Sequence, residues 1–343
     1  MISKKKSFKN KQKSKKKSFK FKNRNKYKKL KSKKIGNPKI IFAKKQLSDD
    51  FMKKKEGDYF NKKHYDNIID YDCDCYYMDD NDKKQLLFKF RKNVLPLNHC
   101  KLGINNLKEA AKKKHDNRGA AAGKINLKKM PSNANEASQL IGRNKFRVHS
   151  YKSRHTGKIV KNSLGNISQS NIIGYYDKPD RNKGASKHPC RTTAFTSQQV
   201  NKWENVLPLI KSIDKQFKKL IRKNYNIQYK RAHETEFVIG DTAFSTVTIN
   251  YNWRTALHKD AGDLKDGFGN LVVLEEGEYD GGETGFPQFK VAIDVRHGDF
   301  LAMNVHEWHC NTKIIPITKD FTRLSLVAYL RERMIKCKGL SLE

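Results

Sequence analysis

The first 48 residues contain no aspartate and no glutamate, although they contain 21 lysines and arginines. They are also poor in apolar residues, which excludes an independently folded domain because too little surface can be buried. We therefore expect a disordered, lysine-rich basic arm over residues 1–60. One interpretation is a solubilising or nuclear-targeting tail. Another is an electrostatic grip on nucleic acid that does not read sequence, and both can hold at once.

Long apolar runs and cysteine pairs are missing as well. No segment has the length of a membrane span or the apolar stretch of a secretion signal, so we expect an intracellular protein, with the nucleus or a site of DNA replication as candidate locations. The six cysteines are scattered, and Cys73 and Cys75 lack a second ligand pair at the spacing of a zinc site. Reduced thiols are therefore predicted.

Beyond the arm the composition changes twice. Residues 61–91 mix acidic and aromatic side chains, so we expect a linker there. Its acidic stretch, 65–82, could instead bind a partner or fold back on the basic arm. Residues 92–335 have the composition of a globular domain. Within it, the stretch 118–123 predicts a tight loop and lacks the Gly-Lys-Ser/Thr ending of a phosphate-binding loop.

A helical period is followed by a strand period along this domain. Apolar residues recur every three or four positions over 200–221, so we predict a helix capped by Thr196 or Ser197 and kinked or split by Pro208. After residue 236 the period is two. The expected strands cover 244–250, 271–275, 285–288, 291–295, 300–305 and 323–330. This order predicts an α+β domain with flanking helices and a jelly-roll core (a double-stranded β-helix, cupin-like) over 236–332.

His258, Asp260 and His309 carry the chemistry that the sequence indicates most clearly. In an extended segment, residues i and i+2 face the same way, so His258 and Asp260 point together. A His-x-Asp pair followed by a distant histidine has the ligand order of the 2-His-1-carboxylate triad, which holds Fe(II) with open positions for substrate and oxygen. By itself a His-x-Asp pair is weak evidence, because hydrogen-bonded or surface residues account for it equally well.

The distal position offers two histidines, His306 and His309. If a strand runs regularly from residue 300, His309 shares a face with Val305, whereas His306 faces the other way with Trp308. The alternation favours His309 as the ligand. His306 is then a structural residue or an outer partner of a metal-bound imidazole.

Arg323 and Ser325 share one face of the last predicted strand, and Leu324 and Leu326 share the other. An arginine with a hydroxyl at i+2 makes a charge-assisted clamp for a carboxylate, such as that of a 2-oxo acid. The alternative for Arg323 is a surface-strand arginine paired with a glutamate.

Taken together, several segments resemble the TET/J-binding-protein family of Fe(II)- and 2-oxoglutarate-dependent nucleic-acid dioxygenases, and most closely its J-binding-protein-like branch in protists, algae and large DNA viruses. The likeness is strong over 240–330, extends more weakly to 173–181 and 190–195, and does not cover 1–90. The segments are AFST at 243–246, RTALHKDAGD at 254–263, GGETGFP at 281–287, VHEWHCNT at 305–312 and TRLSLV at 322–327.

The resemblance implies roles for individual residues. It makes His258, Asp260 and His309 the iron ligands, and Arg323 with Ser325 the clamp for 2-oxoglutarate. It places Asp263, three residues after the metal aspartate, against the target base, although a simple turn residue is the alternative. The implied cofactors are Fe(II), 2-oxoglutarate as cosubstrate and O2. Unlike TET proteins, this chain has no cysteine-rich zinc module, so their CpG preference is not implied.

The implied reaction is hydroxylation of the C5-methyl of a pyrimidine, 5-methylcytosine or thymine, in nucleic acid, with DNA favoured over RNA. The base must then be flipped out of a duplex or lie in a single strand. The basic surface and arm would supply backbone affinity without choosing a base. Three alternatives stay open: a prolyl- or lysyl-type protein hydroxylase, a binding protein with a degenerate site, and a methylcytosine-modifying enzyme with a different co-reductant.

Overall fold

The structure is a computed structural model, and it describes residues 37–116, 118–124, 146–148, 151–153, 155–160, 164–177 and 190–341. A compact unit spans Pro38–Glu343. Most of the predicted basic arm, residues 1–36, lies outside the described residues, as does the part 178–181 of the weaker family likeness. Among the helices described, none is long and apolar enough to cross a membrane.

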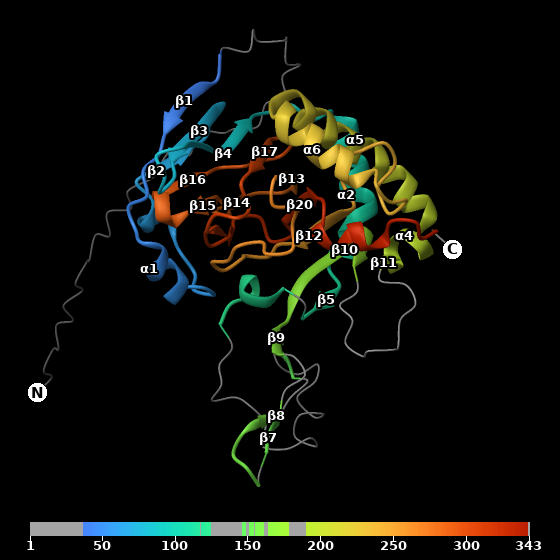
Figure 1. The fold of residues 1–343 in the computed structure, drawn as a ribbon, viewed down its shortest axis with the longest axis horizontal. Coiled ribbons are helices and arrows are strands. Elements are labelled where there is room, and N and C mark those ends of the chain that lie inside the picture. Colours follow the sequence, from blue (N-terminus) through green and yellow to red (C-terminus); the bar gives the residue numbers. More distant parts are fainter. Residues whose placement is uncertain are drawn as a thin grey trace, which may run out of the picture. The chain divides into compact units, whose positions relative to one another are not determined.

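A ten-stranded sheet forms the framework of this unit (Figure 1). Its central strands β17, β13, β20 and β12 are antiparallel neighbours, and among the described strands of this sheet only β1 and β3 pair in parallel. The short strand β5 pairs with β10 beside the main path. In spatial order the strands are β1 (Lys39–Phe42), β3 (Cys73–Met78), β4 (Lys84–Arg91), β17 (Phe300–Met303), β13 (Gly269–Glu276), β20 (Thr322–Tyr329), β12 (Thr246–Tyr251), β10 (Ser168–Asp177) and β11 (Cys190–Thr192), with β5 at Lys114–His115.

A smaller sheet faces the central strands. Its order is β18 (Cys310–Asn311), β15 (Thr284–Phe286), β16 (Val291–Ile293) and β2 (Asn67–Ile69). From β12 to β20 the chain passes repeatedly between the two sheets: β13 and β17 join the large sheet, whereas β15, β16 and β18 join the small one. This alternation is that of a double-stranded β-helix, so the predicted α+β jelly-roll class is confirmed.

Three short two-stranded ribbons and four 3-10 helices complete the described elements. The ribbons are β14 (Tyr279–Asp280) with β19 (Ile315–Pro316), β6 (Phe146–Val148) with β9 (Leu164–Asn166), and β7 (Tyr151–Lys152) with β8 (Ile159–Val160). The 3-10 helices are η1 (Lys62–His64), η2 (Gly119–Ala122), η4 (Pro287–Phe289) and η5 (Glu332–Cys337).

Helices cover one face of the large sheet (Figure 1). Residues two apart in a strand share a face, so Leu324 and Leu326 of β20 both face the helices. They pack in the same apolar cluster as Phe217 of the long helix. Pro208 lies within the long helix, which continues through it. The N-cap of that helix is Gln199 rather than the predicted Thr196 or Ser197, which lie within the preceding short helix capped by Thr193. The helices are α1 (Asp49–Lys54), α2 (Leu97–Ala111), α4 (Ala194–Gln198), α5 (Val200–Leu220) and α6 (Arg222–Ala232).

A second apolar cluster fills the space between the two sheets. Leu271 and Val273 of β13 contribute to it from the large sheet, and Phe286 and Ile293 contribute from the small one. Phe286 stacks on Phe88 of β4 with ring centroids 5.7 Å apart. The large sheet is therefore buried on both faces, and the polar residues on its inner face lie beside this second cluster.

The predicted linker over 61–91 was wrong. This segment supplies β2 to the small sheet and β3 and β4 to the large one, and residues 38–60, assigned to the arm, supply β1 and α1. The acidic residues of this segment suggested an exposed linker, but Asp74 is buried in ion pairs with Lys89 and Arg91, at 2.6 Å each. Cys73 and Cys75 alternate with it and enter the inter-sheet cluster.

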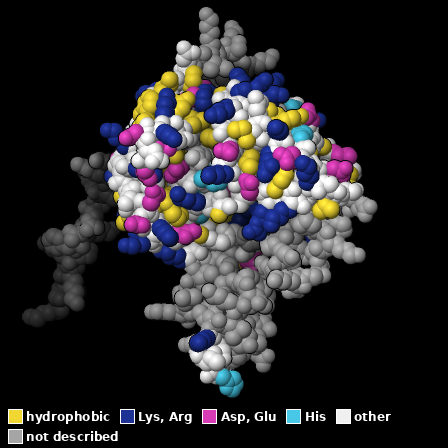
Figure 2. Space-filling model, viewed as in Figure 1, with side chains coloured by type: hydrophobic (Ala, Val, Ile, Leu, Met, Phe, Trp, Pro, Cys, Tyr) yellow, Lys and Arg dark blue, Asp and Glu magenta, His cyan; other side chains and the backbone are white. Residues whose placement is uncertain are grey.

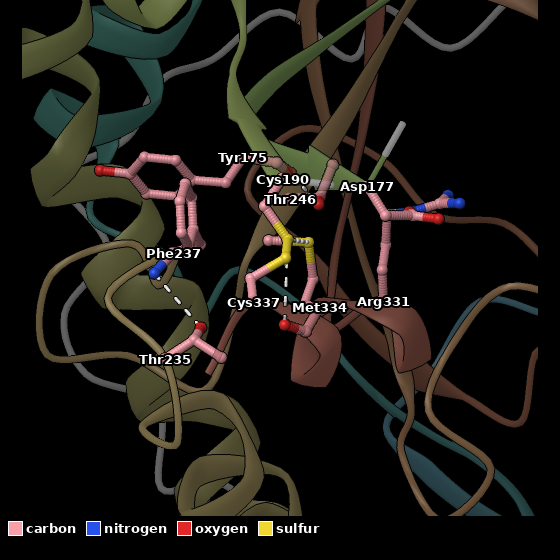
Figure 3. The surroundings of a disulfide bond; sticks show 9 residues. All are labelled: Tyr175, Asp177, Cys190, Thr235, Phe237, Thr246, Arg331, Met334 and Cys337. Atoms are coloured by element: carbon pink, nitrogen blue, oxygen red, sulfur yellow. Dashed lines mark hydrogen bonds and ion pairs between the residues drawn. A yellow bond between two sulfur atoms is a disulfide. The ribbon is translucent and has the colours of Figure 1, made fainter. Parts of the chain in front are cut away.

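The prediction of reduced thiols was wrong for two of the six cysteines. Cys190 of β11 and Cys337 of η5 form a disulfide across 147 residues, with their Cα atoms 6.0 Å apart (Figure 3). That Cα separation lies within the usual range for a disulfide. The two cysteines adjoin in the fold because η5 packs against the edge of the large sheet. Cys73, Cys75, Cys100 and Cys310 are free and buried.

Gly281 and Gly282 make a turn that only glycine tolerates, since both have a φ of +79°. A Cβ on Gly281 would lie 1.8 Å from the carbonyl oxygen of Lys313. We expect Gly281→Ala to lower the free energy of unfolding in urea by clearly more than the roughly 1–2 kcal/mol that a left-handed backbone costs by itself. Gly240→Ala is the matched control, because Gly240 has a φ of +51° and open space around it. Equal losses in the two variants would contradict the steric explanation.

Candidate metal centre and active-site cavity

The structure brings His258, Asp260 and His309 together. One potential ligand atom from each lies within 4.8 Å of the others. Asp260 bridges the two imidazoles, with its carboxylate oxygens 3.6 Å from His258 Nε2 and 3.7 Å from His309 Nε2. The backbone fixes this convergence, because His258 and His309 exchange two N–H to O=C hydrogen bonds of 3.0 Å each. The Asp260 N–H donates to Val305 O at 3.0 Å.

The hydrogen bonds of the two imidazoles fix which nitrogen faces inward. His258 Nδ1 lies 2.8 Å from Ala256 O, and His309 Nδ1 lies 2.9 Å from Glu307 O. A carbonyl only accepts, so each Nδ1 carries a proton, and Nε2 is the ring nitrogen left to bind a metal. In both residues this nitrogen is the one beside Asp260. Backbone-anchored imidazoles of this kind are typical metal ligands.

The protonation of His309 also suits a metal ligand. Burial, followed by the charge of His258, lowers the pKa of His309 to about 4. The imidazole is therefore neutral at neutral pH, as a ligand must be. Two imidazole nitrogens and one carboxylate are the donor set of a non-haem Fe(II) centre, so the residues present fit this metal.

His306 is directed elsewhere. Its Nε2 lies 3.1 Å from Leu264 O, and it is not part of the convergent group. Trp308 joins a separate apolar cluster and carries the ammonium of Lys259 over its ring, 5.1 Å from the centroid. Of the two distal histidines that the sequence offered, the structure brings His309 to Asp260.

A cavity of about 360 Å³ opens beside the three residues. Ser325 of β20 lines it, and Asn250 of β12 donates to the Ser325 hydroxyl at 3.2 Å. The Oδ1 atom of Asn250 is buried without a hydrogen-bond partner in the described part of the chain. Thr284 and Asn311 of the small sheet add further polar groups to the wall. This part of the cavity can accept a small polar molecule next to His258 and His309.

Arg323 precedes Ser325 by two residues on the same face of β20 but is not among the lining side chains. It is 1% exposed, and its Nη2 donates to Gly282 O at 3.0 Å. Its Nε has no hydrogen-bond partner among the described residues. A buried guanidinium with an unused donor suits an anionic ligand.

Asp263 also lines the cavity, on a stretch bridged to Arg331. Burial, then the charge of Asp260, raise the pKa of Asp263 well above its usual value, and Arg331 opposes the shift. Arg331 in turn pairs with Asp177 (Figure 3). Asp263 is therefore a partly desolvated carboxyl group close to the three converging residues, rather than an isolated turn residue.

Arg118 is a cavity residue that the sequence did not indicate. It adjoins the 3-10 helix η2, whose Gly119, Ala120 and Ala121 also line the cavity. Its guanidinium donates to Ser170 Oγ at 2.7 Å and Thr248 Oγ1 at 3.2 Å. The stretch 118–123 does form the predicted tight turn, but no local sequence pattern indicates that this turn lines the cavity.

Residues 171–332 match the Tet_JBP family, the oxygenase domain of the 2OGFeDO superfamily. This segment contains His258, Asp260, Asp263, His309 and Arg323. Over these residues, which make up just under half of the chain, the sequence is similar to a Tet_JBP oxygenase domain. The Tet_JBP domain implies Fe(II), 2-oxoglutarate and O2 as its cofactors, in agreement with the donor set described above.

Part of the chain is also similar to curated relatives. The chain is 34% identical over 160 residues to the bifunctional helicase and thymine dioxygenase JBP2 of Leishmania tarentolae. This alignment covers 47% of this chain and 14% of that protein. It is 34% identical over 165 residues to thymine dioxygenase JBP1-A of Trypanosoma cruzi. This alignment covers 47% of this chain and 19% of that protein. These alignments thus span less than a fifth of either relative's length. A solved structure, NgTET1 in complex with 5mC DNA, aligns over 88% of this chain and 84% of that one, with 12% identity and a TM-score of 0.47.

Proposed function

We propose that this protein is an Fe(II)- and 2-oxoglutarate-dependent dioxygenase that hydroxylates the C5-methyl of a pyrimidine, thymine or 5-methylcytosine, in DNA. The observation that carries the proposal is the convergence of His258, Asp260 and His309 beside a cavity, within a Tet_JBP oxygenase domain. The relatives from Leishmania tarentolae and Trypanosoma cruzi are named as thymine dioxygenases, which favours thymine as the first substrate to test.

Each residue has a proposed task. His258, Asp260 and His309 would hold the iron, and their backbone bonds keep the two Nε2 atoms aimed at it. Arg323 and Ser325 would bind the far carboxylate of 2-oxoglutarate by charge-assisted hydrogen bonds. When bound, iron and 2-oxoglutarate supply the oxygen activation and C–H hydroxylation chemistry, which no side chain of the protein provides.

The substrate end of the site is proposed to centre on Asp263. Its carboxyl group could contact a pyrimidine through N3–H of thymine or the amino group of cytosine. A methyl group within a stacked duplex is out of reach of a walled cavity, so the base must be flipped out or come from a single strand. Arg118 and Tyr329, which line the same cavity, would form part of the wall around such a base.

The decisive experiment is mass spectrometry of nucleosides after incubation of the protein with Fe(II), 2-oxoglutarate and DNA. Thymine-containing, 5-methylcytosine-containing and unmethylated cytosine oligonucleotides form the three arms. We expect 5-hydroxymethyl products from at least one of the methylated bases, with matching succinate release. Hydroxylation of basic peptides but not of DNA would favour a prolyl- or lysyl-type hydroxylase, and a product that needs no 2-oxoglutarate would indicate another co-reductant.

DNA is the proposed partner of the basic residues. Lys and Arg side chains are spread over the face of the described residues seen in Figure 2, with acidic side chains among them. Residues 1–36 add 18 lysines and arginines without an acidic residue. Positive charge of this kind binds phosphates without reading sequence, and such binding weakens as salt rises.

We also propose that the catalytic unit begins at Pro38, since β1 belongs to its sheet.

A truncation tests the role of the basic segment. Removing residues 1–36 leaves β1 intact, whereas removing 1–48 would delete an edge strand of the large sheet. We expect the shorter deletion to weaken DNA binding and to flatten the plot of log affinity against log salt, because each phosphate contact contributes a slope of roughly 0.9. Turnover on short oligonucleotides at saturating concentration should persist. Equal salt slopes for the full-length and truncated proteins would contradict the proposal.

A further inference from the structure

Arg323 and Glu275 lie directly opposite each other on β20 and β13. They are on the inner face of the sheet, because the neighbouring pair Ser325 and Val273 also faces inward, toward the cavity and the inter-sheet cluster. Opposite charges at such facing positions usually pair. Here they do not: in the described part of the chain, no carboxylate lies within 4.0 Å of the Arg323 guanidinium.

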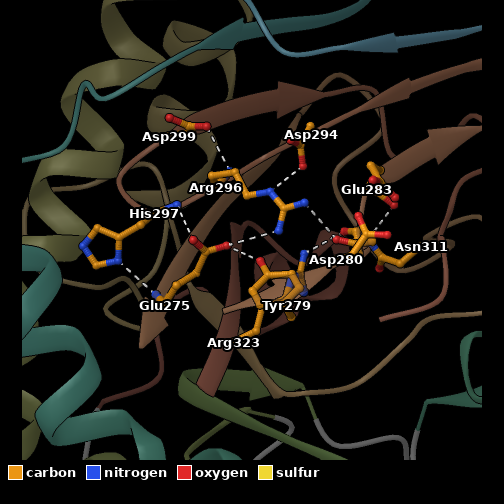
Figure 4. Close-up of polar contacts among 12 residues, drawn as sticks. Glu275, Tyr279, Asp280, Glu283, Asp294, Arg296, His297, Asp299, Asn311 and Arg323 are labelled. Atoms are coloured by element: carbon orange, nitrogen blue, oxygen red, sulfur yellow. Dashed lines mark hydrogen bonds and ion pairs between the residues drawn. The ribbon is translucent and has the colours of Figure 1, made fainter. Parts of the chain in front are cut away.

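The oxygens of Glu275 are engaged by other groups (Figure 4). The Tyr279 hydroxyl donates a hydrogen bond to Oε1, and the backbone N–H of His297 donates to Oε2 at 3.2 Å. Nη1 of Arg296 lies 3.8 Å from Oε1. The glutamate is therefore drawn toward Tyr279, His297 and Arg296 instead of toward Arg323.

Arg296 is itself firmly held in this position. Its Nε lies 2.5 Å from Asp294 Oδ1, and its Nη2 donates to Gly281 O at 3.2 Å. Its guanidinium lies over the ring of Tyr279, 4.7 Å from the centroid, and the guanidinium of Arg323 lies 6.0 Å from the same centroid. Tyr279 thus contacts both arginines and offers its hydroxyl to the carboxylate that could otherwise neutralise Arg323.

Within the described residues, the buried guanidinium of Arg323 has a single hydrogen-bond acceptor, the carbonyl of Gly282. The carbonyl of the preceding residue, Gly281, accepts from Arg296. Gly282 leaves room for the Arg323 guanidinium, since a Cβ there would lie 3.1 Å from Arg323 Nε. Leaving a buried charge without a counter-ion is costly, so such an arrangement is expected where an anionic ligand completes it.

We propose that Tyr279 and Arg296 are positioning residues that hold Glu275 away from Arg323, so that the guanidinium stays available for the carboxylate of 2-oxoglutarate. The proposal rests on the proposed role of Arg323 as the cosubstrate clamp. Tyr279 and Arg296 do not touch the cosubstrate. They act by keeping a competing carboxylate, built into the neighbouring strand, out of the clamp.

Tyr279→Phe tests this directly, because it keeps the ring and removes the hydroxyl that Glu275 accepts from. We expect the dissociation constant for 2-oxoglutarate to rise roughly ten- to a hundredfold, the size of losing a charge-assisted hydrogen-bonded pair. The measurement is anaerobic titration calorimetry of the Mn(II)-loaded protein, which needs no turnover. Adding Glu275→Gln should restore the affinity, since an amide cannot neutralise Arg323.

Arg296→Met should also weaken 2-oxoglutarate binding and be rescued by Glu275→Gln. Glu276→Gln is the matched control, because Glu276 is adjacent in β13 but pairs with Lys108. Wild-type affinity in both Tyr279→Phe and Arg296→Met, or a loss that Glu275→Gln does not restore, would overturn the inference. Arg323→Met separates the two proposals. If this variant also binds 2-oxoglutarate normally, the proposed role of Arg323 as the clamp is wrong. If Arg323→Met is the only variant that loses binding, the clamp stands and the proposed role of Tyr279 and Arg296 is wrong.

Discussion

His309→Ala is expected to abolish both Fe(II) binding and hydroxylation. Alanine removes one of the two imidazole nitrogens that converge on Asp260, and no other histidine of the described chain lies within reach of the group. Losing an outer partner of a metal ligand costs roughly 10–100-fold in metal affinity, so losing the ligand itself should cost more. Anaerobic titration with Fe(II), followed by nucleoside mass spectrometry, measures the two effects separately.

His306→Ala is the matched control, three residues away on the same loop. Its imidazole bonds to Leu264 O, so the expected loss is about 1 kcal/mol of stability, with iron binding retained. If His306→Ala removed iron binding and His309→Ala did not, the proposed ligand set would be wrong. Both variants should be compared by circular dichroism, so that misfolding is recognised as a cause of lost activity.

Arg323→Met is expected to raise the KM for 2-oxoglutarate by about two orders of magnitude while leaving DNA affinity nearly unchanged. Methionine fills much of the same volume but offers no donor, and losing a charge-assisted hydrogen bond costs roughly 1.5–3 kcal/mol. The measurement is succinate release as a function of 2-oxoglutarate concentration, alongside fluorescence anisotropy with a labelled oligonucleotide. A parallel loss of DNA affinity would indicate a collapsed site rather than a missing clamp.

Arg333→Met provides the control for charge alone. Arg333 is exposed in η5, and its replacement removes the same single positive charge as Arg323→Met does. It should leave the KM for 2-oxoglutarate unchanged. An equal rise in KM for Arg333→Met and Arg323→Met would mean that the net charge of the protein, and not a specific clamp, governs cosubstrate binding.

Much of the jelly roll could be predicted because its strands follow a period of two. The predicted strand 323–330 matches β20, and its alternation places Leu324 against the helices and Ser325 against the cavity. The strands within 61–91 were missed, because Asp74 stands between Cys73 and Cys75 at the start of β3. Asp74 reads as a solvated residue until Lys89 and Arg91 are brought beside it.

The sequence by itself determined the direction of side chains along each strand, and therefore that His258 and Asp260 face together, as do Arg323 and Ser325, because this depends only on local backbone geometry. Only the tertiary structure decided which distal histidine meets Asp260, that Arg118 lines the same cavity, that Cys190 joins Cys337, and that Glu275 turns away from the arginine opposite it. These are contacts between segments far apart in the chain or choices among several nearby partners. Their outcome depends on how the two sheets pack, and local periodicity carries no information about that packing.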